Sequence, residues 1–311
     1  MDVVRVENLR KRYGGVVAVE DVSFTVRRGE IFGLLGPNGA GKTTTVECLQ
    51  GLRGRDGGRD GGRVEVLGLD PAREPEQLRR RIGSQLQSSA LPDRLRVAEA
   101  IRLFAPPGSG GDVEATLTAW DLAALRRRPF AALSGGQRQR LFLALAMLGQ
   151  PEVVFLDELT TGLDPQARRV TWDLLRGVRD RGATVVLVTH LMEEAQALCD
   201  RVAIVDGGRV VALDRPDTLT AQQGGPITIT FTVDGHDVGF LAGIPGISNV
   251  STTGDVVTIA GQARATVPVA AALAERGLFP ADFRTHHPTL EDVFLATTGR
   301  RLRDEPQRRP Q

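Results

Sequence analysis

The fold of this chain is indicated most strongly by residues 36–44, which read Gly36-Pro37-Asn38-Gly39-Ala40-Gly41-Lys42-Thr43-Thr44. The apolar run 31–35 precedes this stretch and a helical pattern follows it, so a buried strand leads into a glycine-rich turn and then into a helix. Glycines let the backbone curl until consecutive N–H groups point at phosphate oxygens, and the helix N-terminus adds a positive potential. Lys42 supplies a point charge for β- and γ-phosphates, and Thr43 offers a hydroxyl to Mg²⁺. The stretch therefore predicts a phosphate-binding loop.

Two acidic residues stand where a second apolar strand is expected to end. The run Val153-Val154-Phe155-Leu156 is followed directly by Asp157 and Glu158. In an α/β sheet, the carboxyl end of such a strand lies at the same edge as the phosphate-binding loop. We therefore expect Asp157 to hold Mg²⁺ through water, and Glu158 to polarise an attacking water toward the γ-phosphate.

The patterns around these motifs are those of an α/β protein. Residues 184–188 form another continuous apolar run, which is typical of a parallel strand covered on both faces. Helical patterns occupy residues 136–148 and 166–181, between the apolar runs. Residues 3–9 and 16–26 instead alternate apolar and polar side chains, which predicts a half-buried antiparallel ladder. The sequence therefore predicts an α/β P-loop core with an antiparallel β subdomain.

Changes in composition and in secondary-structure pattern divide the chain further. Residues 88–133 interrupt the alternation of strand and helix, and we expect a small helical subdomain there, within a nucleotide-binding domain over 1–220. A plausible linker, Gln222-Gln223-Gly224-Gly225-Pro226, leads to strand and helix patterns that predict a small α+β domain over 226–299. The tail 300–311 is polar, contains two prolines and is expected to be disordered.

Composition excludes several classes of protein. The 311 residues carry 39 Lys+Arg and 38 Asp+Glu, a net charge of +1, so bulk charge does not call for nucleic acid as a partner. Cys48 and Cys199 lie far apart, which favours reduced structural thiols over a disulfide framework. No signal peptide and no run of about 18 apolar residues is visible, so we expect a soluble chain. If it acts at a membrane, another chain must cross the bilayer.

A third motif, Leu133-Ser134-Gly135-Gly136-Gln137, directly precedes a predicted helix and stands about twenty residues before Asp157. Together with the two motifs above, it resembles the signature sequence of the ATP-binding-cassette ATPases. The resemblance implies that Ser134 and Gly136 close over ATP bound to a second subunit, so that a head-to-tail homodimer sandwiches two ATP molecules. Because the acid pair and the signature are both intact, both sites of such a homodimer are expected to work.

The resemblance also assigns roles to residues outside the three motifs. In that family an aromatic residue near the N-terminus stacks on adenine, and Tyr13 occupies the matching place. A glutamine senses the γ-phosphate, binds Mg²⁺ and faces the membrane subunit, and the family's spacing selects Gln87 over Gln85. The segment that ends at Asp164 resembles the D-loop, which crosses the dimer interface. His190 matches the histidine that contacts the γ-phosphate.

The resemblance thus implies three sets of site residues. The catalytic set is Lys42, Gln87, Glu158 and His190, and the Mg²⁺ ligands are Thr43, Gln87 and Asp157. The residues expected to bind ATP are Tyr13, Gly36, Pro37, Asn38, Gly39, Ala40, Gly41, Lys42, Thr43, Thr44, Ser134, Gly135, Gly136, Gln137 and Asp164. The chain departs from many relatives at Leu159, where they have proline, and this bears on local rigidity and not on activity.

The C-terminal sequence points to one branch of the family. Residues 287–295 and 297–300 resemble the ending of daunorubicin-resistance-type export ATPases, and so do 156–165 and 189–195. That branch implies an exporter ATPase at the cytoplasmic face of the cell membrane, with a separate multi-helix permease of the ABC-2 class, and drug or antibiotic efflux as a substrate class. A soluble relative acting on ribosomes or nucleic acid, and an importer ATPase, remain as alternatives. The transported substrate is not encoded in this chain.

Overall fold

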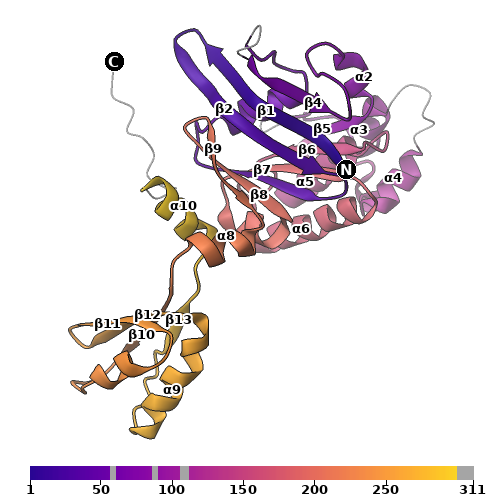
Figure 1. Ribbon diagram of the computed structural model, residues 1–311. Coiled ribbons are helices and arrows are strands. Elements are labelled where there is room, and N and C mark those ends of the chain that lie inside the picture. The colour runs from indigo at the N-terminus through magenta and orange to yellow at the C-terminus, as the bar shows by residue number, and fades with distance from the viewer. Residues whose placement is uncertain (57–60, 86–89, 106–111, 300–311) are drawn as a thin grey trace, which may run out of the picture. The chain divides into compact units, whose positions relative to one another are not determined.

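The computed structural model describes residues 1–56, 61–85, 90–105 and 112–299 (Figure 1). The chain forms two compact units, of which the first comprises Met1–Pro216 and the second begins at Asp217. In these described ranges, no helix has both the length and the apolar character needed to cross a bilayer.

The first unit is built on a large mixed sheet. In the described part of the chain its nine strands lie in the order β4-β1-β2-β9-β8-β3-β7-β6-β5. The strands are β1 (Asp2–Tyr13), β2 (Val16–Arg27), β3 (Ile31–Leu35), β4 (Arg63–Val66), β5 (Ile82–Gln85), β6 (Val153–Asp157), β7 (Thr184–Thr189), β8 (Arg201–Asp206) and β9 (Arg209–Asp214). Strands β5, β6, β7, β3 and β8 run parallel, whereas β4, β1 and β2 form antiparallel pairs.

Burial along the strands explains this division. Every residue of β3, β6 and β7 is buried, as expected for apolar strands with helices on both faces. In β1 and β2 buried and exposed residues largely alternate, because one face of the ladder is solvated. The structure therefore confirms the fold class that the alternating and continuous apolar patterns of the sequence predicted.

Seven helices in the described ranges belong to the first unit. They are α1 (Lys42–Leu49), α2 (Pro75–Arg79), α3 (Val97–Phe104), α4 (Val113–Ala119), α5 (Gly135–Ala146), α6 (Pro165–Asp180) and α7 (Met192–Leu198). Helix α1 packs between the antiparallel ladder and the parallel strands, and its Val46 and Leu49 lie in a core shared with Val6 of β1 and Phe155 of β6. Helix α3 packs on α4 and α5, and α5 packs on α6.

The second unit contains a sheet of its own. Helix α8 (Pro216–Gln223) leads into it, and its described elements are β10 (Ile227–Thr232), β11 (Ile247–Thr253), β12 (Val256–Gly261), α9 (Thr266–Glu275), β13 (Arg284–His286) and α10 (Leu290–Thr298). The strands are antiparallel in the order β11-β12-β10-β13, and a 3₁₀ turn at Gly239–Gly243 stands between β10 and β11. This is the connectivity of a split β-α-β motif. Ile229 and Phe231 of β10 pack with Val269 and Leu273 of α9.

The parallel strands of the first unit end level with one another, which positions the site. Leu35 at the end of β3 pairs with Thr189 at the end of β7, and Asp157 at the end of β6 pairs with Val188. The residues that follow these three strands therefore meet at one edge of the sheet.

Candidate active site

The phosphate-binding loop connects β3 to α1 at this edge. Gly41 directly precedes α1 with φ +97° and ψ +5°, a left-handed conformation that glycine adopts without steric cost. No side chain caps the helix, so the first N–H groups of α1 stay available to an anion at its N-terminus. The loop packs against β2, since a Cβ on Gly41 would lie 2.3 Å from the carbonyl oxygen of Ala18.

Lys42 is held inside the loop. Its Nζ donates hydrogen bonds to the carbonyl oxygens of Gly36 at 2.8 Å and Pro37 at 2.9 Å. Burial lowers the pKa of Lys42, while the negative charges of Glu158 and Asp157 act in the opposite direction. The loop backbone therefore holds the ammonium group within the electrostatic influence of the two acids, and a phosphate would be its natural counter-ion.

Asp157 provides an oxygen suited to a cation. The residue is buried, and burial raises the pKa of its carboxyl group, while a hydrogen bond from the Thr43 side chain lowers it. Its Oδ1 atom is buried, and no hydrogen bond reaches it from the residues that the structure describes. A buried carboxylate oxygen beside a threonine hydroxyl fits Mg²⁺, which prefers oxygen ligands. The third predicted ligand, Gln87, lies outside the described residues.

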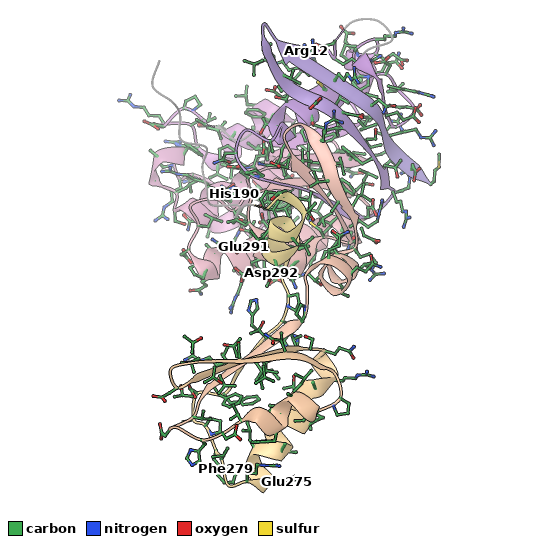
Figure 2. The ribbon with its side chains drawn as sticks, turned by 60° about the vertical axis from the view of Figure 1, so that its left-hand side comes forward. Arg12, His190, Glu275, Phe279, Glu291 and Asp292 are labelled. Atoms are coloured by element: carbon green, nitrogen blue, oxygen red, sulfur yellow. The ribbon has the colours of Figure 1, made fainter. Side chains whose placement is uncertain are left out.

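Glu158 and His190 come together although 32 positions separate them. His190 Nδ1 lies 3.1 Å from Glu158 Oε1, because β6 and β7 are parallel neighbours and each residue follows its strand directly. The Glu158 side chain is only 11% exposed. Its backbone is left-handed, with φ +51°, and its N–H donates to the carbonyl oxygen of Val188 at 2.9 Å. The pair thus stands at the same edge as Lys42 and Asp157. Figure 2 labels His190 in the first unit.

The signature residues form the start of α5. Ser134 is the N-cap: its hydroxyl accepts from Gln137 N at 3.3 Å, and its own N–H donates to Gln137 Oε1 at 3.0 Å. A Cβ on Gly135 would lie 3.4 Å from the Leu163 side chain, so the start of α5 lies beside the loop that precedes α6. Within the described part of the chain, no hydrogen bond or ion pair joins these four residues to the phosphate-binding loop.

Asp164 also has a local structural role. Its Oδ1 accepts from Gln166 N at 3.0 Å and Ala167 N at 2.9 Å, which makes it the N-cap of α6. A Cβ on Gly136 would lie 3.4 Å from Ala167, so the start of α6 lies beside the start of α5. The signature and the predicted interface loop therefore share one surface.

Tyr13 ends β1, where it pairs with Val16 across the hairpin. Its side chain is exposed, and Lys11 Nζ stands 5.3 Å from the ring centroid. An exposed aromatic ring of this kind can stack on a base. Leu159 is fully buried.

Two polar residues near the site have contacts that sequence reasoning did not anticipate. Gln85, rejected above in favour of Gln87, is buried and its Nε2 donates to Gln139 Oε1 at 3.0 Å, which ties β5 to α5. Glu194 on α7 is fully buried and accepts hydrogen bonds from Thr160 and Trp172. The available signal for Glu194 was an acid on the inward face of a short helix, beside Ala195 and Leu198.

Comparison with known proteins agrees with the geometry. Residues 19–161 match the family model described as ABC transporter. The chain is 37% identical to the daunorubicin resistance ATP-binding protein DrrA3 of Streptomyces coeruleorubidus, over 95% of this chain and 96% of that protein. It is 38% identical to the Nod factor export ATP-binding protein I of Ralstonia nicotianae, over 97% and 95% respectively. These matches extend over both units.

Solved structures give the same picture for the fold. The structure of an ATP-binding subunit of an ABC transporter is 30% identical to this chain, with a TM-score of 0.62, over 71% of this chain and 93% of that one. An ATP-binding cassette of an ABC transporter in its ADP conformation is 24% identical and has a TM-score of 0.63, over 70% and 92%.

Proposed function

The chain belongs to the ATP-binding-cassette family of transporter ATPases, among its exporter subunits, and from this premise we propose that it energises a separate permease of the ABC-2 class. The observation that carries ATP hydrolysis is the meeting of four groups at one sheet edge, and the exporter relatives support the permease as partner. Lys42, Asp157 and the contact between Glu158 and His190 surround the carboxyl ends of β3, β6 and β7. This set contains what phosphoryl transfer to water requires of a protein.

Each residue has a defined part in the proposed reaction. The loop 36–41 and Lys42, whose Nζ is held by the carbonyl oxygens of Gly36 and Pro37, would bind the β- and γ-phosphates through backbone N–H groups and charge. Thr43, Asp157 and Gln87 are the proposed ligands of Mg²⁺, which when bound neutralises charge on the phosphate oxygens. Glu158 accepts a hydrogen bond from the attacking water and orients it. His190, within hydrogen-bonding distance of Glu158, contacts the γ-phosphate.

The signature supports a dimer of this chain. Ser134, Gly135, Gly136 and Gln137 have no bond to the phosphate-binding loop in the described ranges, and they share a surface with the start of α6. In the proposed assembly these four residues cover the ATP that is bound to a second copy. In each copy, Tyr13 stacks on the adenine of the ATP bound to its own phosphate-binding loop. Asp164 lies at the interface and orders it by capping α6. Two copies then enclose two ATP molecules.

Replacing Glu158 by Gln tests the catalytic role. Because the amide cannot accept a proton from water, we expect kcat for ATP to fall by about 10²-fold or more, with ATP binding retained and the closed dimer accumulated. The exposed Glu193, which pairs with Arg168 at 3.6 Å, provides the matched control Glu193→Gln, expected to hydrolyse ATP normally. Steady-state hydrolysis and size-exclusion chromatography with ATP measure both effects. Sustained turnover by Glu158→Gln would refute the assignment.

The segment from Gln87 to Phe104, of which the structure describes residues 90–104, is the proposed docking site for a short cytoplasmic helix of the permease. Helix α3 supports this, because its neighbouring residues Leu103 and Phe104 are exposed at 69% and 50% and place two large apolar side chains at the end of one helix. Substituting both by Ser is expected to uncouple transport while basal hydrolysis continues. Val170→Ser on α6, also at an exposed apolar residue, is the control and should leave coupling intact. Loss of ATP binding in the α3 variant would contradict this assignment.

The proposed location is the cytoplasmic face of the cell membrane, through the permease. Purification of the tagged chain from gently solubilised membranes should recover an apolar partner with about six spanning segments in equal amount. Ribosomal or DNA-bound partners, with no membrane association, would leave the ATPase assignment standing and overturn the transport one. The name of the daunorubicin resistance relative supports drug or antibiotic efflux as one class of cargo to test, and the name of the Nod factor export relative supports a second class.

A further inference from the structure

Glu194 of α7 is a fully buried acid that the proposed catalytic set does not include. Its side chain is fully buried, and its Oε1 atom accepts two hydrogen bonds, from Thr160 Oγ1 at 2.7 Å and from Trp172 Nε1 at 3.1 Å. Its Oε2 atom is also buried, and no hydrogen bond reaches it from the residues that the structure describes. Burying a carboxyl group in this way is unfavourable compared with an apolar side chain of similar size. A role in stability alone does not explain it.

The two donors come from segments next to the proposed site. Thr160 follows Glu158 by two residues and is itself fully buried. Trp172 lies on α6, the helix that Asp164 caps. Glu194 follows His190 by four residues, on the helix that begins at Met192. A single carboxylate oxygen therefore joins the segments that carry Glu158, Asp164 and His190.

The turn at Glu158 needs such a restraint. Its φ of +51° is a conformation that residues other than glycine hold only when their surroundings enforce it. Two backbone hydrogen bonds contribute: Glu158 N donates to Val188 O at 2.9 Å, and Thr161 N donates to Glu158 O at 3.2 Å. The bond from Thr160 to Glu194 anchors the same turn from the inside of the protein.

We propose that Glu194 is a positioning residue, which holds the turn after Glu158 against the helix after His190 and so sets the 3.1 Å contact between these two side chains. The inference rests on the catalytic role proposed above for Glu158. Glu194 touches neither nucleotide nor water in this scheme. It acts by alignment, and a small displacement of a catalytic group is enough to lower a rate by a large factor.

Paired substitutions at both ends of the bond test this. Glu194→Ala and Thr160→Val remove the acceptor and one donor, and we expect kcat for ATP to fall about 10- to 100-fold while the Kd for a fluorescent ATP analogue changes less than about threefold. Glu194→Gln and Thr160→Ser keep an acceptor oxygen and a donor hydroxyl, and should restore kcat to within about threefold of the wild type. All assays use the full chain.

Glu30 provides the matched control. It is also a buried glutamate of the first unit, bonded to Arg27 N at 2.8 Å and Arg201 Nη1 at 3.3 Å, but it precedes β3 and so lies at the opposite edge of the sheet. Glu30→Ala should lower the melting temperature without lowering kcat. If Glu194→Ala does not fold, the pair Thr160→Val and Thr160→Ser decides the question.

The outcomes separate this inference from the function on which it rests. Equal kcat for Thr160→Val and Thr160→Ser, or kcat unchanged in folded Glu194→Ala, would overturn the positioning role. Parallel losses of kcat and nucleotide affinity would overturn it as well, since they indicate general damage. If Glu158→Gln still turns over ATP, the catalytic assignment itself fails, whatever the Glu194 variants do.

Discussion

The phosphate-binding loop offers a sharp test of the packing described above, because two of its glycines both have a positive φ but differ in their surroundings. Gly39 has φ +79° and Gly41 has φ +97°, both in the left-handed region. A Cβ on Gly41 would lie 2.3 Å from the carbonyl oxygen of Ala18, well inside contact distance, whereas a Cβ on Gly39 would meet no atom within 4 Å. Gly41→Ala and Gly39→Ala are therefore a matched pair.

The expected losses of stability follow from the cost of a left-handed backbone and the cost of contact between the new Cβ and β2. Left-handed backbone costs an alanine about 1 kcal/mol at either position. Forcing the Gly41 Cβ against Ala18 adds about 2 kcal/mol, since neither the loop nor β2 can shift freely. For a unit of this size, about 1 kcal/mol lowers the melting temperature by about 2–4 °C. Gly41→Ala should therefore lose about 6–12 °C, and Gly39→Ala about 2–4 °C.

Thermal unfolding of the nucleotide-free chain, followed by circular dichroism, measures both losses under one set of conditions. Urea titration gives the same comparison as free energies and guards against irreversible melting. Because both variants gain a Cβ in the same loop, effects on the unfolded chain cancel in the difference between them. Equal losses, or a larger loss for Gly39→Ala, would refute the idea that contact with β2 separates these two positions.

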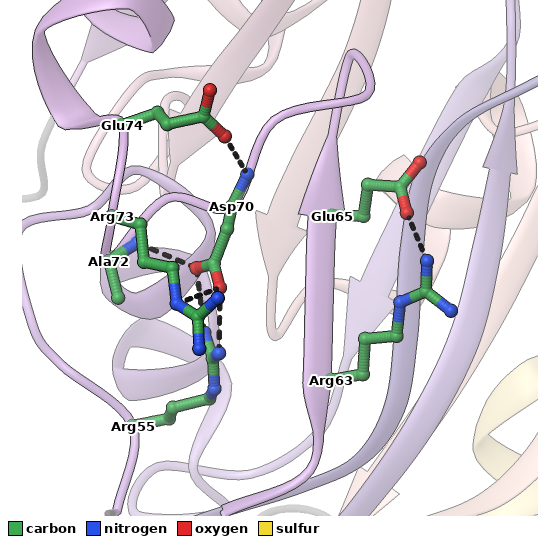
Figure 3. A network of polar contacts seen from close by, with 7 residues as sticks. All are labelled: Arg55, Arg63, Glu65, Asp70, Ala72, Arg73 and Glu74. Atoms are coloured by element: carbon green, nitrogen blue, oxygen red, sulfur yellow. Dashed lines mark hydrogen bonds and ion pairs between the residues drawn. The ribbon is translucent and has the colours of Figure 1, made fainter.

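Three further outcomes are expected. Two hydrogen bonds from the Arg55 guanidinium hold the pKa of Asp70 at about 2, below its ordinary 3.8 (Figure 3). This stabilisation of the folded state is present above pH 3.8 and is lost as the pH falls toward 2. Asp70→Asn should therefore lower the free energy of unfolding by about 1 kcal/mol at pH 7, with solvent screening taken into account, and by less below pH 4. Urea titrations across that range check it, and a pH-independent difference would contradict it. Burial raises the pKa of Cys48 to about 11 and that of Cys199 well above its usual range, so neither should react with a thiol reagent at pH 8 until urea unfolds the chain. Ser134→Ala removes a helix cap and should cost about 1 kcal/mol of stability in urea titrations, yet it should abolish most ATP hydrolysis; activity that falls only with stability would argue against a role over the second ATP.

Much of the fold could be predicted because its signals are local. The apolar runs at 31–35, 153–156 and 184–188 became fully buried strands, since only a sheet covered on both faces can accommodate such runs. The alternating stretch 16–26 became a strand of the solvated ladder, for the corresponding reason. The sequence signals for the starts of helices were equally local. Ser134 with Gln137 forms a capping box, which depends only on residues three apart.

Contacts of the site depended on pairing over long distances in the sequence. His190 and Glu158 meet because β7 pairs with β6 in a register that places Val188 beside Asp157, and no local pattern specifies that register. The same holds for the bond of Glu194 to Thr160, which spans 34 positions. Asp164 combines a local and a non-local role. Its bonds to Gln166 N and Ala167 N, two and three residues away, make it a helix cap, whereas its place at a dimer interface is a prediction from family resemblance.

By itself, then, the sequence determined the residue types needed for nucleotide chemistry, the elements that carry them and the class of fold, because glycine spacing, apolar periodicity and capping act within a few residues. Only the tertiary structure decided which of these residues touch. It buried Lys42 among loop carbonyls, left Asp157 Oδ1 without a hydrogen bond from the described residues, and joined Glu194 to Thr160 in the turn after Glu158. The physical reason is that strand register and helix packing are settled by the burial of the whole core, and burial is a property that no short stretch of sequence possesses alone.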